Sequence, residues 1–492
     1  MTAGGSLHGW PARLALALLL VAGCTQATAP PPPFAAVSAA PAATSGTLAP
    51  PLANVAPPVL DGTRAKAHLD YLAHPARGGR YTGSQGFADA AAYVVDRFRE
   101  IGLEPLGDDG TFLQRFQMPI VTLAATPILE AVAGKGYVHR RDFTELVGGN
   151  RGSGAGEGEL IFVGAGSRSD FATVSARGNV VLIAGAGDSD PLANAIAEGA
   201  VAAIIASDRI LKYSTLPRFD ARTIPTIVAT EATVDELIAA SGKRLDDLRR
   251  AVDEGRRGGD SAMAPLSFAT GARVRVAVPL TPVTEIETYN VVGLLRGGDP
   301  DASKRAVLVG GHLDGVGTDP DGTVFPGAND NASGPAVTIE IARALAARKA
   351  ELRHSVVFVA FSGEEEGLYG SEAYASRMAA IPGRTESLIA YLNLDVVGCC
   401  GSSLAASPES PSLYARIERV AGSLGLSVAT TRGSSDHVTF ARRRVDAAIL
   451  LWSNTGPLHT PHDTADIVDA RHLQQLGDVA AQVVFELARD GD

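Results

Sequence analysis

Apolar stretches alternate with amphipathic stretches from residue 290 to the C-terminus. The apolar stretches 306–311, 354–361, 387–394 and 447–452 are nearly free of polar residues and have the length of strands. Between and after them, residues 336–349, 412–425 and 471–490 repeat apolar residues at helical spacing. Strands that are apolar on both faces, separated by helices, are typical of a layered α/β fold. We therefore predict a mostly parallel central sheet covered by helices.

The region 134–275 has a different pattern. It is rich in Gly and Ala, and short apolar stretches such as "GELIFVGAG" and "GNVVLIAGAG" alternate with helical ones such as "PLANAIAEGAVAAIIASD". It has no histidine or acidic cluster of the kind that binds metals. We predict an inserted α/β domain over 134–275, including a linker, within a main domain made of 59–133 and 276–492.

The first 58 residues do not have the pattern of a folded domain. Residues 1–23 contain an apolar run after Arg13 that has the length of a signal peptide. The run ends in "LVAGC", which resembles a bacterial lipoprotein processing box that would make Cys24 the acylated first residue. The Pro- and Ala-rich residues 24–58 have the composition of a tether. We expect export, either as a cell-envelope lipoprotein attached to a membrane through Cys24 or as a secreted protein.

Composition and charge narrow the class of protein. The chain has 492 residues, of which 46% are apolar and 20% charged, as in soluble globular proteins. The net charge of −11 argues against a nucleic-acid partner, which would require basic surfaces. Besides Cys24, the only cysteines are the adjacent Cys399 and Cys400. We expect these two not to pair with each other, because the ring would strain the peptide between them.

Histidine and carboxylate side chains follow the predicted strands. In parallel sheets such positions meet at one edge, where ligands bind. A cluster of buried carboxylates without a cation would be destabilising, so their convergence favours a divalent metal centre. Mixed nitrogen and oxygen ligands suit zinc or cobalt better than magnesium or calcium. The residues in question are His312, Asp314, Asp330, Glu364, Glu365, Glu366, Asp395, His459, His462 and Asp463.

Five motifs occur in a specific order, namely "GGHLDGVG", "GANDNASG", "GEEEGLYGS", "LNLDVVG" and "HTPHDT". Together they resemble the dizinc exopeptidases of the bacterial leucyl aminopeptidase and plasma glutamate carboxypeptidase type. The resemblance spans roughly residues 60 to 492, and the insert is similar to the protease-associated domain. It implies the three-layer zinc-exopeptidase fold, two zinc ions, and hydrolysis of peptides by a water that the zinc ions activate.

The resemblance also implies roles for individual residues. His312 and Asp395 would bind one zinc ion, Glu365 and His459 the other, and Asp330 both. Glu364 corresponds to the general base of catalysis. Asp314 corresponds to the carboxylate that orients His312, as is common for histidines that bind metals.

Other residues are candidates for contact with the substrate. "GSSDHVTF" is similar to a segment that lines the substrate cleft in the family, which makes Asp436 and His437 candidates. Glu366 is expected to be a solvated acid or one at a helix N-terminus, or else a contact for the substrate amine. His462 and Asp463 are expected to order the loop around His459.

The function predicted from the sequence is an extracytoplasmic zinc aminopeptidase that removes N-terminal residues from peptides. A carboxypeptidase or dipeptidase on the same scaffold is the alternative, and a catalytically dead binding module a weaker one. The oligomeric state stays open.

Overall fold

The computed structural model describes residues 57–491, except 133, 186–189, 214–221 and 258–265. The expected signal peptide, Cys24 and nearly all of the expected tether lie outside the described residues. Among the described residues, no helix is long and apolar enough to cross a lipid bilayer.

The larger of two sheets has nine strands, in the order β1-β11-β13-β12-β14-β17-β15-β16, and β2 pairs with β11. The central strands β13, β12, β14 and β17 are parallel to one another. Antiparallel pairs occur toward both edges, at β11–β13 and β15–β17. The strands are β1 (Glu104–Pro105), β2 (Leu113–Ile120), β11 (Thr284–Leu295), β12 (Ala306–His312), β13 (Ser355–Phe361), β14 (Leu388–Leu394), β15 (Leu404–Ala406), β16 (Val428–Thr430) and β17 (Ala447–Trp452).

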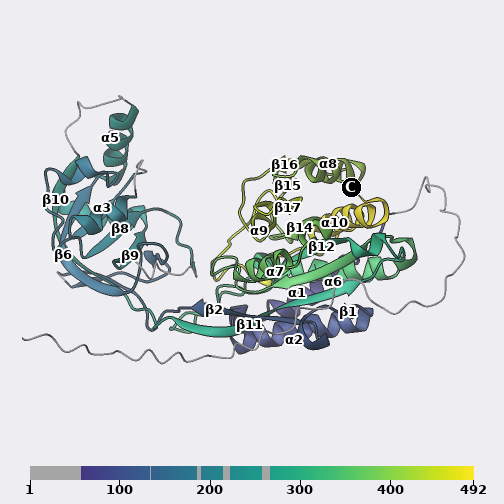
Figure 1. Cartoon of the computed structure of the whole chain (residues 1–492). Coiled ribbons are helices and arrows are strands. Elements are labelled where there is room, and N and C mark those ends of the chain that lie inside the picture. Colours follow the sequence, from purple (N-terminus) through teal and green to yellow (C-terminus); the bar gives the residue numbers. More distant parts are fainter. Residues whose placement is uncertain (1–56, 133, 186–189, 214–221, 258–265, 492) are drawn as a thin grey trace, which may run out of the picture.

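Helices cover both faces of this sheet, so the unit has three layers (Figure 1). One face packs against α1 (Gly62–Leu72), α2 (Gln85–Ile101), α6 (Ser333–Ala346), α8 (Pro411–Ser423) and α10 (Ala470–Asp490). The other face packs against α7 (Tyr369–Ala379) and α9 (His437–Ala441). The predicted α/β layered fold is confirmed.

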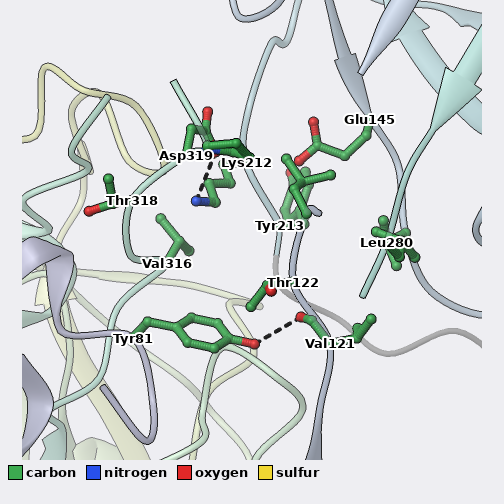
Figure 2. Close-up of a pocket in the computed structure, with 13 residues that line it drawn as sticks. Tyr81, Val121, Thr122, Glu145, Lys212, Tyr213, Leu280, Val316, Thr318 and Asp319 are labelled. Atoms are coloured by element: carbon green, nitrogen blue, oxygen red, sulfur yellow. Dashed lines mark hydrogen bonds and ion pairs between the residues drawn. The ribbon is translucent and has the colours of Figure 1, made fainter. Parts of the chain in front are cut away.

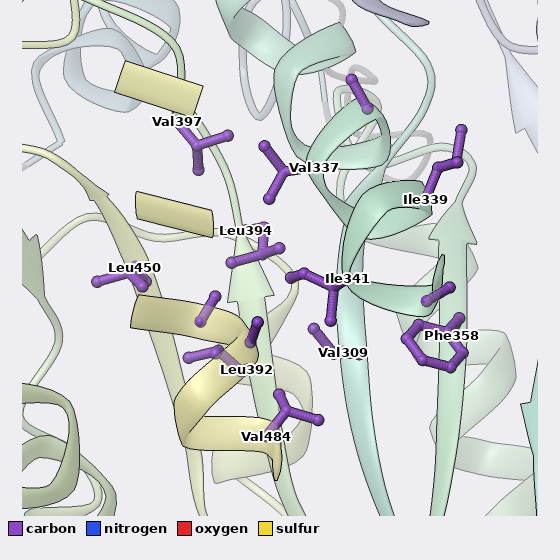
Figure 3. Close-up of a cluster of buried hydrophobic side chains, with 14 of the residues drawn as sticks. Val309, Val337, Ile339, Ile341, Phe358, Leu392, Leu394, Val397, Leu450 and Val484 are labelled. Atoms are coloured by element: carbon purple, nitrogen blue, oxygen red, sulfur yellow. The ribbon is translucent and has the colours of Figure 1, made fainter. Parts of the chain in front are cut away.

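The core follows from the alternation of side chains along each strand. In β12, Val307 and Val309 pack into the cluster with α6 and α10, whereas Leu308 packs into the cluster on the opposite face. Figure 3 shows Val309 and Leu392 of neighbouring strands meeting Ile341 of α6 and Val484 of α10. Because every position of these strands is buried, the sequence shows a continuous apolar run instead of an alternating one.

The second sheet has its own hydrophobic core and consists of eight strands, in the order β4-β3-β10-β6-β7-β8-β9-β5. Its helices are α3 (Pro191–Ala197), α4 (Glu231–Ile238) and α5 (Leu245–Arg257). We call this unit the insert. Its strands are β3 (Ile128–Ala131), β4 (Lys135–Gly136), β5 (Phe143–Glu145), β6 (Gly154–Val163), β7 (Val180–Ile183), β8 (Ala202–Ala206), β9 (Thr226–Ala229) and β10 (Ser267–Val278).

The long antiparallel ribbon of β2 and β11 leads from the larger sheet to the insert (Figure 1). Its register pairs Leu113 with Val291 at one end and Ile120 with Thr284 at the other. The chain therefore leaves the larger unit and returns to it along the same ribbon.

Candidate metal centre

The histidine and carboxylate groups predicted from the sequence meet at the carboxyl edge of the central strands. His312 is the last residue of β12, and Asp395 directly follows β14. Glu365 follows β13 and His459 follows β17, each after a short loop. Asp330 lies in an irregular turn, Ala328–Ala332, directly before α6.

Asp330 lies between two histidines and faces each with a different oxygen. Its Oδ1 lies 3.3 Å from Nε2 of His312, and its Oδ2 lies 3.1 Å from Nε2 of His459. Asp395 Oδ1 lies 3.4 Å from the same nitrogen of His312. Glu365 Oε2 lies 3.3 Å from the same nitrogen of His459. The site thus consists of two histidine–carboxylate pairs that share one carboxylate.

The donor atoms of this cluster fit divalent metal ions. His312, Asp330 and Glu365 each offer a ligand atom, and these atoms lie within 4.8 Å of one another, as do those of His312, Glu364 and Asp395. Both ring nitrogens of His312, Oε1 of Glu365 and Oδ1 of Asp395 are buried without a hydrogen-bond partner among the described residues. Buried polar atoms are normally satisfied, and a metal ion would satisfy these. Imidazole and carboxylate ligands together suit zinc.

The pKa values of the buried side chains also indicate that this cluster lacks positive charge. Burial, together with the neighbouring Asp330, raises the pKa of Glu365 to about 8. Burial also raises the pKa of Glu364 well above its ordinary value, and neighbouring acids add to this effect. Burial opposes protonation of His459, but Glu365 and Asp330 outweigh it and raise its pKa to about 10. A divalent cation would stabilise the ionised carboxylates that are otherwise disfavoured.

Two further carboxylates hold the candidate ligands in place. Asp314 Oδ1 lies 3.7 Å from Nδ1 of His312, and Asp314 Oδ2 accepts a hydrogen bond from the backbone N–H of Glu365. Asp463 accepts hydrogen bonds from the backbone N–H groups of Asn329 and Asp330, at 2.8 and 3.0 Å. Asp463 thus fixes the turn that carries Asp330, while His462 is exposed.

The substrate-side candidates are all at the site or close to it, but Glu366 differs from its expected environment. Asp436 and His437 are fully buried at the start of α9. Glu366 is only 3% exposed and accepts a hydrogen bond from the Thr82 hydroxyl. The expectation of a solvated acid is wrong, because the loop after α1 covers this end of the sheet.

The expectation for the adjacent cysteines is also wrong, because Cys399 and Cys400 form a disulfide with each other. Cys400 has a left-handed backbone with φ of 75°. This turn brings the side chains of Cys399 and Cys400 to the same side of the chain, so that the two sulfur atoms meet. In a strand, neighbouring side chains would point to opposite sides.

Arg80 is a residue of the site that the sequence did not reveal. It is fully buried, and among the residues that the structure describes its guanidinium donates hydrogen bonds only to backbone carbonyls. Leu313, between His312 and Asp314, accepts from Nε at 2.8 Å. Pro326 and Gly327, which lead to Asp330, accept at 2.7 and 2.8 Å. Arg80 therefore joins two loops that carry candidate ligands, and no histidine or acid in its own loop "PARGGRYTG" indicated this.

Comparison with known proteins finds a family for part of the chain. Residues 290–484 match the model of "Peptidase family M28". We call this region the M28 domain, after the family model that it matches. All the candidate ligands lie within it, whereas Arg80 and the insert lie outside.

Curated relatives match parts of the chain. Aminopeptidase YwaD of Bacillus subtilis (strain 168) is 30% identical over 226 residues, which are 43% of this chain and 47% of that protein. An aminopeptidase of Pseudomonas aeruginosa is 42% identical over 112 residues, 23% of this chain and 18% of that protein. The chain thus matches less than half the length of either relative.

Solved structures match more of the chain than these sequences do. The "Aminopeptidase from Aneurinibacillus sp. strain AM-1" has a TM-score of 0.64 at 22% identity, covering 88% of this chain and 95% of that one. "BSAP, a zinc aminopeptidase from Bacillus subtilis" has a TM-score of 0.61 at 22% identity, covering 88% and 96%. At this identity the likeness shows a shared fold, which includes both the M28 domain and the insert.

The role of Arg80 gives a testable prediction. Arg80→Met leaves buried carbonyls of Leu313, Pro326 and Gly327 without donors, at about 1–3 kcal/mol for each. We expect the melting temperature to fall by at least about 6 °C. Trp452, the only tryptophan besides Trp10, is buried in the M28 domain and reports unfolding by its fluorescence.

The matched control is Arg77→Met in the same loop. Arg77 pairs with the partly exposed Asp89, and its replacement is expected to change the melting temperature by only a small fraction of that amount. Equal effects of the two substitutions would contradict the role assigned to Arg80.

Proposed function

We propose that this protein is a zinc-dependent exopeptidase, specifically an aminopeptidase that hydrolyses the first peptide bond of peptides. The observation that carries the proposal is the position of Asp330, which presents one oxygen to His312 and the other to His459. A carboxylate shared in this way is suited to bridging two metal ions. The aminopeptidase names of the curated relatives support the same class of activity.

The residues divide into two ligand sets around Asp330. His312 and Asp395 would hold one zinc ion, and His459 and Glu365 the other. When bound, the zinc ions would acidify a water molecule and polarise the scissile carbonyl. Asp314 would orient His312 through its Nδ1 atom, and Asp463 would keep Asp330 between the two histidines.

Glu364 is the proposed general base. It lies within reach of His312 and Asp395, and it is more exposed than Glu365 and Glu366. Its carboxylate would accept a proton from the attacking water and then donate it to the leaving amine. Burial and the neighbouring acids raise its pKa, which makes its carboxylate a stronger base for the proton of the water.

The charge around the site favours an amine over a carboxylate as the recognised substrate group. Glu366 and Asp436 are buried acids, and Glu366 directly follows the candidate ligand Glu365 in the chain. The nearby cations are engaged, because Arg80 donates to backbone carbonyls and Lys212 pairs with Asp319. The positively charged N-terminus of a peptide substrate therefore fits this acidic environment better than a C-terminal carboxylate does.

A carboxypeptidase or dipeptidase is the alternative, since both would use the same metal centre. A catalytically dead binding module is disfavoured, because the candidate ligands and Glu364 are all present and close together.

We also propose that the protein acts outside the cytoplasm, as a lipoprotein anchored through Cys24. The support is the apolar N-terminal run that ends in "LVAGC". Labelling with radioactive palmitate in a bacterial host should mark the native chain and fail to mark Cys24→Ala. Equal labelling of both chains would contradict the anchor.

The substrate class is tested with three matched groups of compounds. We expect hydrolysis of aminoacyl-nitroanilides with a free amine, and none of the same compounds after N-acetylation. Chelation of zinc should abolish the activity and added zinc should restore it. Exclusive cleavage of N-blocked peptides with a free carboxylate would instead support a carboxypeptidase, and no cleavage by zinc-loaded protein would support the dead module.

The role of Glu364 is tested by Glu364→Gln, which keeps the shape of the side chain but cannot take up the proton. We expect kcat to fall by about 10²–10⁴-fold while the zinc content stays unchanged. Glu372→Gln is the control, because Glu372 lies on α7 and pairs with Arg443 at the surface. Retention of native turnover by Glu364→Gln would remove Glu364 as the base.

A further inference from the structure

The insert contacts the metal centre through two adjacent residues, Lys212 and Tyr213. The backbone N–H of Lys212 donates to the His459 carbonyl at 3.1 Å, and Nδ1 of His459 lies 2.7 Å from the Lys212 carbonyl. The ring of Tyr213 lies edge-on to the ring of His459, with centroids 5.3 Å apart. His459 belongs to the M28 domain, so these contacts join the two units.

The contact at Nδ1 determines which nitrogen of His459 is free for a metal. A carbonyl oxygen only accepts hydrogen bonds, so Nδ1 must carry the hydrogen. Nε2 is then the nitrogen with a free lone pair, and it is the atom that faces Asp330 and Glu365. Histidines that bind metals generally donate their second N–H in this way, which fixes the tautomer and the ring orientation.

Lys212 is itself held by a buried ion network between the insert and the M28 domain. Its Nζ lies 3.0 Å from Oδ1 of Asp319, which is fully buried (Figure 2). Arg140 of the insert donates to both oxygens of Asp319, at 2.8 and 3.1 Å. Arg140 also pairs with Glu145, so that buried cations and acids alternate in the network. Removing one partner from such a network leaves a charge without compensation.

Further contacts fix the same segment. Thr144 donates a hydrogen bond to the Leu211 carbonyl, directly before Lys212. The ammonium of Lys212 lies 4.7 Å from the ring centroid of Phe325, in the loop that leads to Asp330. Lys212, Tyr213 and Asp319 also line a cavity of about 250 Å³ between the two units (Figure 2). The backbone at Lys212 is thus held from the insert and from the M28 domain alike.

We propose that the insert forms part of the metal centre. Its residue Lys212 positions His459, and Asp319 holds Lys212 in place. The M28 domain supplies the ligands, and the insert supplies the carbonyl that orients one of them. Lys212 is a positioning residue and does not touch the metal. This inference rests on the zinc site of the proposed function. It predicts that loosening Lys212 affects the zinc ion at His459 and Glu365 more than the one at His312 and Asp395.

The test compares zinc release from zinc-loaded full-length variants, followed with a chromophoric chelator. We expect Lys212→Met to release one of two zinc equivalents about 10–100-fold faster than the native protein, with the other unchanged. Lys212→Arg keeps the charge facing Asp319 and should restore slow release. Asp319→Asn, which weakens the same contact from the M28 domain, should again accelerate the release of only one zinc equivalent.

The control is Lys135→Met, which removes a surface lysine of the insert that pairs with Glu236. It should release zinc at the native rate. A merely structural effect of Lys212→Met would lower the melting temperature and accelerate both equivalents alike, and this result would overturn the inference. Native release from both Lys212→Met and Asp319→Asn would overturn it as well. A native protein that binds no zinc would contradict the proposed function itself, which is a distinguishable outcome.

Discussion

The concentration of buried carboxylates at one edge of the central sheet is the constraint on which the rest of the site depends. Asp314, Asp330, Glu365 and Asp395 are each at most 8% exposed, and burial of ionised acids side by side is costly. Two divalent cations would turn this repulsion into attraction. The fold brings the acids together because the carboxyl ends of parallel strands meet, and each loop after a strand contributes one or two of them.

The surrounding structure holds these acids without neutralising the atoms that would bind metal. Asp463 and Arg80 both act on the backbone: Asp463 accepts from N–H groups near Asp330, and Arg80 donates to carbonyls near Asp314 and Asp330. The side-chain oxygens that face the histidines therefore stay available. Burial lowers the pKa of Arg80 to about 10, while the surrounding acids oppose this effect, so the guanidinium stays charged at neutral pH.

The layered fold and the convergence of the candidate ligands were predictable from local patterns. Runs such as 306–311 are nearly free of polar residues, and a histidine or acid follows each of them. Arg80 and Lys212 were not predictable in this way, because their partners lie far away in the sequence and are backbone carbonyls or residues of another unit. The burial of Glu366 was missed for a similar reason, since the Thr82 loop that covers it comes from the other end of the M28-containing unit. The pairing of Cys399 with Cys400 depends on the backbone turn at Cys400, which residue type alone does not specify.

The insert and the M28 domain are joined by side-chain and backbone contacts as well as by the chain. The chain enters and leaves the insert along one ribbon, yet the insert returns to the M28 domain at Asp319 and His459. The match to the M28 family covers residues 290–484 and so omits both Arg80 and Lys212. We therefore propose that the metal centre needs residues from outside the region that carries its ligands.

The proposed function depends on the bridging of two zinc ions by Asp330. It is tested most directly by X-ray diffraction from crystals of the zinc-loaded protein, measured on both sides of the zinc absorption edge. If Asp330 bridges two zinc ions, we expect two anomalous difference peaks about 3.5–4 Å apart, one beside His312 and Asp395 and one beside His459 and Glu365, with Asp330 between them. A single peak, or peaks away from Asp330, would contradict it.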